Sequence, residues 1–306
     1  MRGVVIKSTG SWYTVRTDSN EHIQCRIKGK FRLDDIKHTN PIAVGDVVEY
    51  TVEPEHGTGI IHQIQERKNY IIRKSSNLSK QTHIIASNID QALLVASLVQ
   101  PQTSLGFIDR FILTAEAYHI PTILVFNKAD LCKQGLEDML EDTMSIYRNI
   151  GYTCFSTSVP ENTNTLKLKE LLTNKTTLVS GHSGVGKSSL LNHISPGLNL
   201  KTGQISDFSQ KGTHTTTFAE MFELSFGGYI IDTPGIKEFG LVDFNESEIS
   251  HYFLDMKAYI NQCRFNNCKH INEPHCAIKQ AVENGEIREE RYQSYVNILT
   301  KKDLYF

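Results

Sequence analysis

A glycine-rich segment ending in lysine and serine, residues 181–188, has the spacing of a phosphate-binding loop. It matches G-x-x-x-x-G-K-[ST] between an apolar segment and a helical pattern, which is the context that the motif needs. Glycines let backbone N–H groups turn toward phosphates, and the following helix presents its positive end. We expect Lys187 to contact the outer phosphates in catalysis and Ser188 to bind Mg²⁺; a chance glycine-rich turn is the alternative. The expected nucleotide-binding residues are Gly181, His182, Ser183, Gly184, Val185, Gly186, Lys187, Ser188 and Ser189.

A second acidic motif, Asp232-Thr233-Pro234-Gly235, follows an apolar segment that ends at Ile231. This position puts the carboxylate at the carboxyl end of a strand, where open α/β sheets bind their ligands. Asp232 is expected to hold Mg²⁺ through water, and Gly235 to meet the γ-phosphate with its backbone N–H. Alone, D-x-x-G is a weak motif, and the phosphate-binding loop upstream is what favours this interpretation over a plain turn.

The segment Asn127-Lys128-Ala129-Asp130 fits N-K-x-D, the guanine-reading motif, and also follows an apolar strand pattern. The carboxylate of Asp130 only accepts hydrogen bonds, so it pairs with the two adjacent N–H donors of guanine. Adenine turns a ring acceptor toward the same position and leaves both groups unpaired. The expected ligands are therefore GTP and GDP, with Mg²⁺, and not ATP.

The order of these motifs is unusual, because N-K-x-D precedes the phosphate-binding loop, whereas common GTPases have that loop first. The sequence therefore predicts a circularly permuted domain, which is physically tolerated because domain termini lie at the surface and often close together. Ser156, Thr157 and Ser158 then fall where GTPases have a second guanine-contacting loop, although a simple turn is an equal alternative.

Water activation is less well marked in the sequence. Ile236 stands where Ras-like enzymes carry the glutamine that orients the attacking water, and isoleucine forms no such hydrogen bond. The loop 212–217 lies between the phosphate-binding helix and D-x-x-G, where switch I belongs, so Thr215 or Thr216 is expected to bind Mg²⁺. His214 is the nearest candidate to place or activate water, the alternative being a solvated histidine.

Three cysteines and a histidine, Cys263, Cys268, His270 and Cys276, crowd a short segment near the C-terminus. Three thiolates and one imidazole form the ligand set of a closed tetrahedral zinc site. Four protein ligands leave no open position, so we predict one structural Zn²⁺ that stabilises a unit too small to hold itself by apolar burial. His275 is an alternative ligand beside Cys276.

The rhythm of the chain predicts three parts that position these residues. Short alternating segments over residues 1–72 predict an N-terminal β-barrel of OB type, with an SH3-like barrel as the alternative. Residues 73–240 alternate apolar strands with helical patterns, which indicates an α/β GTPase domain with a parallel sheet. Residues 241–306 are mostly helical and polar, with the Cys/His cluster in the middle and a charged helix over 286–299 near the end, and they are expected to form a small zinc-binding unit.

Composition sets broad limits on function. The chain has 306 residues and a formal net charge of −2, so the whole molecule carries no electrostatic signature of nucleic-acid binding. The first 74 residues, however, hold 12 Lys/Arg against 9 Asp/Glu, and basic residues at 26, 28, 30, 32, 67, 68, 73 and 74 could line an RNA groove. No apolar stretch is long enough to span a membrane and no secretory pattern opens the chain, so a cytoplasmic protein without membrane contact is expected.

With a barrel, a permuted GTPase domain and a Cys3His unit in that order, the chain resembles the ribosome small subunit-dependent GTPase family RsgA, also called YjeQ or YloQ. Its marks are GHSGVGKSS at 181–189, GTHTTT at 212–217, D-x-x-G, N-K-x-D and CRFNNCKHINEPHC at 263–276. The family commonly carries arginine before the switch histidine, where this chain has Thr213. That departure affects the expected switch contacts more than nucleotide binding.

The resemblance implies a Mg²⁺-dependent GTP hydrolase that binds the small (30S) ribosomal subunit and its rRNA, assists late maturation and is stimulated by that subunit. Hydrolysis to GDP and phosphate would drive release, and a monomer is expected. The alternative is a GTP-switched scaffold or translation factor that is not tied to subunit assembly. The two segments expected to respond to the nucleotide, the loop 212–217 and D-x-x-G, are followed closely along the chain by the zinc unit. We therefore also expect hydrolysis to reposition that unit against the barrel.

Overall fold

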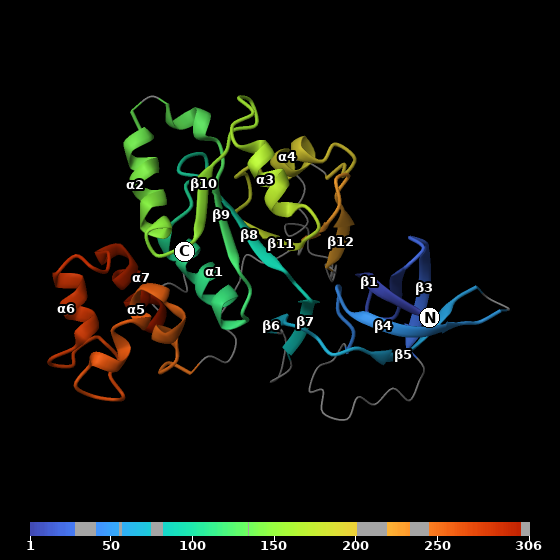
Figure 1. The fold of residues 1–306 in the computed structure, drawn as a ribbon, viewed down its shortest axis with the longest axis horizontal. Helices are drawn as coiled ribbons and strands as arrows, with labels where there is room; N and C mark the ends of the chain where they lie inside the picture. The colour runs from blue at the N-terminus through green and yellow to red at the C-terminus, as the bar shows by residue number, and fades with distance from the viewer. Residues whose placement is uncertain are drawn as a thin grey trace, which may run out of the picture.

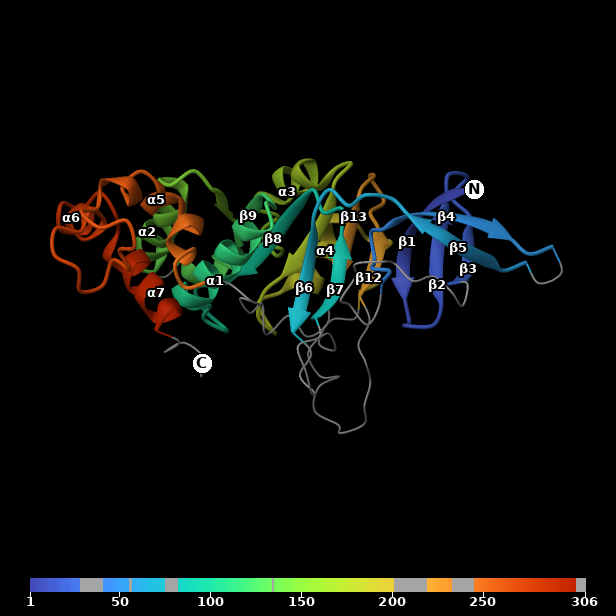
Figure 2. The same cartoon turned by 90° about the horizontal axis from the view of Figure 1, so that it is seen from below.

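The structure is a computed structural model that describes residues 1–27, 41–54, 57–74, 82–133, 135–200, 219–232 and 245–300. The switch residues His214, Thr215 and Thr216, together with Gly235, lie outside the described residues. A central α/β domain separates the N-terminal barrel from the C-terminal helical unit, which lie at opposite ends of the molecule (Figure 1 and Figure 2). Within the described ranges, no helix is long and apolar enough to cross a membrane.

Five strands form the N-terminal barrel in the order β1-β2-β3-β5-β4, and pairing of β1 with β4 closes it. Alternation of side chains drives this closure, since Tyr13 and Val15 of one strand point inward with Cys25, Tyr50 and Ile61 of others. All neighbours pair antiparallel except β3 with β5. This Greek-key barrel confirms the OB-type prediction. Its strands are β1 (Arg2–Ser8), β2 (Tyr13–Thr17), β3 (His22–Ile27), β4 (Val47–Val52) and β5 (Gly59–Ile64).

A two-stranded ribbon, β6 (Tyr70–Lys74) and β7 (Thr82–Ser87), links the barrel to the α/β domain. The rhythm of the sequence did not indicate it, and the expected boundary at residue 72 falls inside β6. Asp46 anchors the ribbon to the barrel: it is fully buried and accepts hydrogen bonds from Arg67 Nε (2.7 Å) and Ser87 Oγ (2.6 Å). Because a buried ion pair is costly to break, the barrel is held firmly at this point.

The central sheet runs β10-β9-β8-β11-β13 with all pairs parallel, and β12 adds an antiparallel edge. Nearly continuous apolar segments form these strands, as expected for a sheet covered on both faces. The predicted α/β domain is therefore confirmed. The strands are β8 (Gln91–Ala96), β9 (Thr122–Phe126), β10 (Thr153–Ser156), β11 (Thr176–Ser180), β12 (Glu220–Glu223) and β13 (Tyr229–Asp232).

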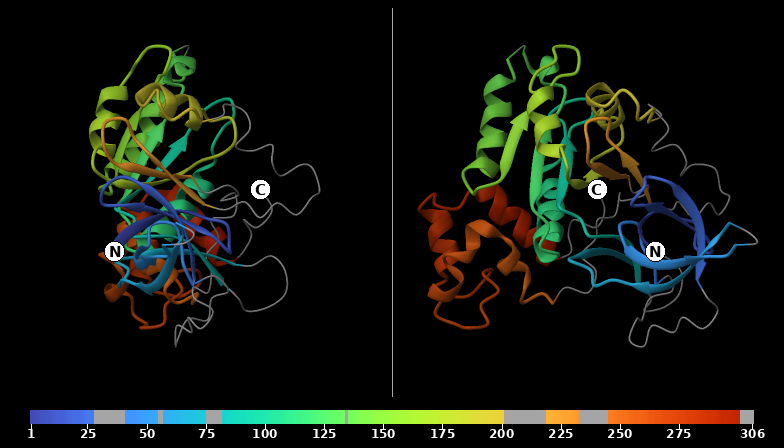
Figure 3. Two further views of the ribbon diagram at one scale, coloured as in Figure 1. Left: turned by 90° about the vertical axis from the view of Figure 1, so that its right-hand side faces the viewer. Right: turned by 45° about the vertical axis from the view of Figure 1, so that its right-hand side comes forward.

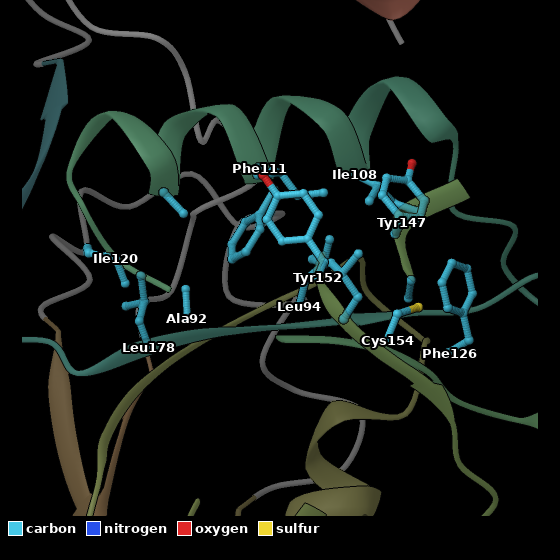
Figure 4. Packing of buried hydrophobic residues seen from close by; sticks show 14 of the residues in the cluster. Ala92, Leu94, Ile108, Phe111, Ile120, Phe126, Tyr147, Tyr152, Cys154 and Leu178 are labelled. Carbon is cyan, nitrogen blue, oxygen red and sulfur yellow. The ribbon is translucent and has the colours of Figure 1, made fainter. Parts of the chain in front are cut away.

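Two layers of helices cover the two faces of this sheet (Figure 3). On one face, Ile108 and Phe111 of α1 pack with Tyr147 of α2 against alternate strand residues such as Leu94 (Figure 4). On the other face, helices α3 and α4 cover Leu93 and its neighbours. The helices are α1 (Leu105–Ala117), α2 (Glu137–Arg148), α3 (Thr165–Leu172) and α4 (Lys187–Ile194), with a short 3-10 turn η1 (Ala129–Cys132).

The barrel and the central sheet are continuous, because β1 pairs with the edge strand β12 at Lys7 and Glu220. The two side chains also form an ion pair of 3.1 Å (Lys7 Nζ to Glu220 Oε1). This pair is exposed, so it adds little to the free energy of unfolding, but it places the barrel beside the strand that follows the predicted switch loop.

The C-terminal unit is helical, as predicted, and its charged helix begins at Glu289 instead of residue 286. Its own small core gathers around Phe253, Met256, Ile278 and Tyr295, and Leu113 of α1 joins it. The elements are η4 (Ile249–Tyr252), α5 (Leu254–Lys257), η5 (Ile260–Gln262), α6 (Ala277–Glu283) and α7 (Glu289–Leu299).

Candidate guanine-nucleotide site and metal centre

The predicted nucleotide motifs meet at one edge of the central sheet. Strands β10, β9, β11 and β13 run parallel, so their carboxyl ends lie at the same edge. Four motifs follow or close these strands: residues 156–158, 127–130 and 181–188, and Asp232. The reversed order of the motifs along the chain therefore does not prevent them from lying together.

The phosphate-binding loop has the backbone that its glycines allow. Gly181, Gly184 and Gly186 have φ of +142°, +83° and +90°, a region that other residues rarely adopt. A Cβ atom at Gly181 would overlap the carbonyl oxygen of Val95, and one at Gly186 would overlap the amide of Asn127. The loop therefore fits tightly between its neighbours, and helix α4 starts immediately after it.

The side chain of Lys187 folds over the mouth of this loop. Its Nζ donates to the carbonyl oxygens of Gly181 (2.5 Å) and His182 (2.6 Å). A phosphate bound by the loop would offer oxygens to the same ammonium group. The ammonium group of Lys187 therefore lies beside the loop to which the motif assigns it.

Asn127 joins three loops of the site. The residue is buried, its Nδ2 donates to the carbonyl of Val185 (2.9 Å), and its Oδ1 accepts from Thr157 Oγ1 (3.0 Å). It therefore connects the N-K-x-D segment to the phosphate-binding loop on one side and to the segment 156–158 on the other.

Asp130, the expected guanine reader, is oriented by the same third loop. Ser158 Oγ donates to Asp130 Oδ1 at 2.6 Å, and the backbone N–H of Ala129 donates to the carbonyl of Thr157 (3.0 Å). Residues 156–158 thus lie beside the N-K-x-D segment. Their proximity supports the guanine-loop interpretation over an unrelated turn.

The loop 97–104 after β8 was not foreseen as part of the site. Gln100 offers its carbonyl oxygen to Lys128 Nζ, and Pro101 lies against Gly184 of the phosphate-binding loop. Strand β8 separates β9 from β11, so the loop that follows it must lie between the guanine and phosphate segments. No motif in the sequence marks this loop. Its place in the site follows from the central position of β8, which is known only from the order of the strands in the sheet.

Asp232 closes β13 at the edge of the site. Its register partners are Val179 of β11, two residues before the phosphate-binding loop, and Glu220 of β12. The carboxylate is half-buried. This places an acidic group near the start of the loop, as a Mg²⁺-associated aspartate requires.

The four predicted zinc ligands lie together in the C-terminal unit, with all ligand atoms within 4.8 Å of one another. The Sγ atoms of Cys263 and Cys276 are 3.9 Å apart, and His270 Nδ1 lies 3.5 Å and 3.4 Å from them. Zinc–thiolate bonds of about 2.3 Å in a tetrahedron place sulfur atoms about 3.8 Å apart. The donor set and its spacing therefore fit Zn²⁺, and burial lowers the pKa of His270, which favours the neutral imidazole that a metal needs.

Groups around the cluster hold its backbone in place. Glu273, unnoticed in the sequence, accepts from the N–H groups of Lys269 (2.8 Å), Ile271 (3.0 Å) and Asn272 (3.1 Å). Tyr292 of α7 donates to the carbonyl of His270 (2.7 Å), and Tyr295 donates to that of Lys269 (2.8 Å). Such outer contacts orient the ligating side chains.

Three of the basic residues considered for an RNA groove form ion pairs with carboxylates of the same chain. Arg67 is half-buried and pairs with Asp46 at 2.7 Å, so its guanidinium is engaged within the protein. Arg26 pairs with Glu53 (3.0 Å) and Lys68 with Asp90 (3.0 Å), although both side chains remain exposed. Trp12 is 42% exposed on the barrel and is free to stack on a base.

Together these features define a circularly permuted guanine-nucleotide-binding P-loop domain flanked by an OB-type barrel and a Cys3His unit. The family model RsgA GTPase matches residues 64–242, and the model RsgA N-terminal domain matches residues 2–61. The chain belongs to the RsgA GTPase family.

Relatives and solved structures agree with this membership. The small ribosomal subunit biogenesis GTPase RsgA of Flavobacterium johnsoniae is 56% identical, over 98% of this chain and 93% of that protein. The protein called small ribosomal subunit biogenesis GTPase RsgA 2 of Bacteroides thetaiotaomicron is 52% identical over 99% and 97%. The crystal structure of YjeQ from Thermotoga maritima has a TM-score of 0.79 and 37% identity over 98% of this chain and 97% of that one. The structure of YloQ, a circularly permuted GTPase, has a TM-score of 0.74 and 34% identity over 100% and 96%.

Proposed function

We propose that this protein hydrolyses GTP to GDP and phosphate while bound to the small ribosomal subunit, and that it assists the late maturation of that subunit. The observation that carries the proposal is the hydrogen bonding of Asn127 to both the phosphate-binding loop and the segment 156–158. These two bonds support the interpretation that the permuted motifs form a single guanine-nucleotide site. Relatives whose names describe small-subunit biogenesis match the chain over nearly its full length.

Individual roles follow from the geometry and the motifs. Lys187 and the N–H groups of the loop would contact the outer phosphates, and Ser188, together with Asp232 through water, would hold Mg²⁺. Asp130, oriented by Ser158, pairs with the two donors of guanine. On the motifs alone, Thr215 or Thr216 would hold Mg²⁺ and Gly235 would contact the γ-phosphate. His214 would place the attacking water, since the side chain of Ile236 has no hydrogen-bonding group. A bound Mg²⁺ would neutralise charge on the phosphates.

We also propose that Cys263, Cys268, His270 and Cys276 hold one zinc ion with a structural role. The ligand spacing supports this, and four protein ligands leave no position for a substrate. Because ribosomal subunits mature in the bacterial cytoplasm, we infer that the protein acts there. The barrel, with Trp12 and the exposed basic residues Arg26 and Lys68, is the part that we assign to rRNA contact.

GTP turnover titrated with isolated small subunits tests the proposal. We expect the rate to rise strongly with subunit concentration and to saturate, with large subunits as the control. A rate that is unchanged by small subunits, in protein that binds GTP normally, would favour the alternative of a GTP-switched scaffold or translation factor unrelated to subunit assembly.

A further inference from the structure

The first two turns of helix α1 contact the phosphate-binding loop on one side. The ring of Phe107 lies on that of His182, with ring centroids 3.9 Å apart and planes inclined by 31°. His182 is the second residue of the loop, and its carbonyl oxygen accepts from Lys187 Nζ at 2.6 Å. One residue therefore contacts both the lysine of the phosphate site and the start of α1.

The same turns of α1 hold the zinc unit on their other side. Asp109 Oδ1 accepts from Arg291 Nη1 of α7 at 2.5 Å, and Arg291 also makes two bonds of 3.0 Å to Asp255 of α5. All three side chains are nearly inaccessible to water. Tyr147 Oη donates to Asp109 at 3.0 Å, which adds α2 to the network.

The charges of this network are not balanced, since one guanidinium serves two carboxylates. Burial raises the pKa of Asp109, although the nearby charge of Arg291 opposes this shift. Removing one partner from such a buried network is strongly destabilising, so α7 is unable to leave α1 freely. A displacement of the start of α1 is therefore passed on to α7.

A surface pocket lies beside this contact. The pocket is half-open to solvent and has a volume of about 510 Å³; Phe107 and Arg110 line it on one side, and Glu289, Gln293 and Asn297 on the other. Side chains on the wall of such a pocket have fewer neighbours than side chains in a close-packed interior, so they are less constrained. Phe107 borders this pocket as well as the phosphate-binding loop, so its ring has space to shift toward α7.

We propose that α1 couples the nucleotide bound at the phosphate-binding loop to the position of α7 in the zinc unit, with Phe107 as the positioning residue that transmits the change. The inference rests on the proposed guanine-nucleotide binding. Bound phosphates draw the ammonium of Lys187 away from the carbonyl of His182, and the ring of His182 then shifts on Phe107. This route runs through packed side chains, and it differs from the covalent link that follows Asp232.

Coupling of this kind is reciprocal, so it is measurable at α7 without any assay of hydrolysis. Amide hydrogen exchange of residues 289–299 is compared in the full-length, zinc-loaded protein without nucleotide, with GDP and with a non-hydrolysable GTP analogue, each saturating. In the wild type we expect exchange rates in α7 to differ by about fivefold or more between these states, the lower end of typical coupling.

The substitution Phe107→Leu should abolish most of this difference, because a leucine side chain does not form the ring contact with His182. Phe107→Tyr keeps the ring and should restore the response. Tyr118→Leu is the matched control, since Tyr118 is a half-buried aromatic residue at the far end of α1, beside Tyr70 and away from the phosphate-binding loop. It should respond like the wild type.

The outcomes separate this inference from the proposed function. If the wild type binds GDP and the analogue but α7 exchanges at one rate in all states, the coupling is wrong and guanine binding stands. If α7 in Phe107→Leu responds to nucleotide as fully as in the wild type, Phe107 does not transmit the change. His182→Gln removes the other ring and should abolish the same nucleotide-dependent difference in α7 exchange at saturating nucleotide. This variant replaces Phe107→Leu as the test if Phe107→Leu folds poorly. Failure of the wild type to bind any guanine nucleotide would overturn the proposed function itself.

Discussion

The side-chain amide of Asn127 donates a hydrogen bond of 2.9 Å to the carbonyl of Val185, a residue 58 positions further along the chain. The first residue belongs to the guanine-reading segment and the second to the phosphate-binding loop. The two halves of the nucleotide site are therefore fastened to each other and not only to the sheet.

Replacing Asn127 with alanine should weaken GTP and GDP binding to a similar extent. The substitution leaves the buried Val185 carbonyl and Thr157 hydroxyl without this partner, at a cost of about 1–3 kcal/mol, or roughly fivefold to 150-fold in Kd. Isothermal titration with both nucleotides measures this. Thr157→Val is the matched variant, because it removes only one of the two bonds and should have a smaller effect. Equal affinities for Asn127→Ala and the wild type would contradict the fastening role.

Asp130→Asn should reduce the preference for guanine. An asparagine side chain places a donor toward the base, so binding of xanthosine triphosphate, which has a carbonyl where guanine has its amino group, should improve relative to GTP. Ser158→Ala should weaken GTP binding more mildly, because it removes the 2.6 Å bond that orients the carboxylate. Competition among GTP, ATP and xanthosine triphosphate checks both variants, and unchanged discrimination between GTP and ATP in Asp130→Asn would refute the assignment.

His214→Ala tests the predicted water-placing residue. We expect GTP affinity to stay close to that of the wild type while the turnover number falls by about 10²-fold or more, the usual contribution of a positioned acid–base group. Turnover is measured with saturating GTP, with and without small subunits. Normal binding together with a full rate would remove His214 from the mechanism.

Metal removal should unfold the C-terminal unit selectively. The purified protein is expected to contain one zinc per chain, and Cys263→Ser should lower that content, because a serine hydroxyl is a poor zinc ligand. Cys132→Ser is the control, since Cys132 is a thiol that lies outside the cluster. Glu273→Gln should release zinc to a chelator faster than the wild type, because it weakens three bonds to the ligand-bearing turn. Wild-type protein without zinc after careful purification would contradict the structural role.

Asp90 should make a pH-dependent contribution to stability. Burial acts to raise the pKa of Asp90, but hydrogen bonds from the backbone N–H of Thr176 and from Lys68 hold it below its ordinary value. The folded protein thus binds this proton less readily than the unfolded chain. The stabilisation is therefore fully present above about pH 4 and is lost as the pH falls through the lowered pKa.

The measurement for Asp90 is the difference in free energy of unfolding between the wild type and Asp90→Asn, by urea titration from pH 3 to 7. The residue is partly exposed, so the difference should be only about 0.5–1 kcal/mol near neutral pH and should shrink toward the acid end. Because other carboxylates titrate equally in both proteins, they cancel. A difference that grows toward low pH would contradict the sign of the shift.

The sequence by itself determined the kinds of sites that this protein has. Phosphate-binding loops, guanine-reading segments and zinc clusters are short, and each requires particular residue types at fixed spacing, because backbone geometry and ligand chemistry act over a few residues. The alternation in residues 1–72 and the α/β rhythm after them likewise reflect local burial, so the classes of the domains were predictable. The ribbon β6–β7 was not, since it pairs segments on either side of the change in rhythm.

Only the tertiary structure decided how these sites are joined. The bond from Asn127 to Val185, the ion pair of Arg67 with Asp46 and the ion pair of Arg291 with Asp109 connect residues that are 58, 21 and 182 positions apart. Such pairs leave no periodic signal, because the side chains are brought together by the order of strands and the packing of helices. The motifs of the sequence therefore indicated what the protein binds, and the packing around α1 indicates how the nucleotide and zinc sites are connected.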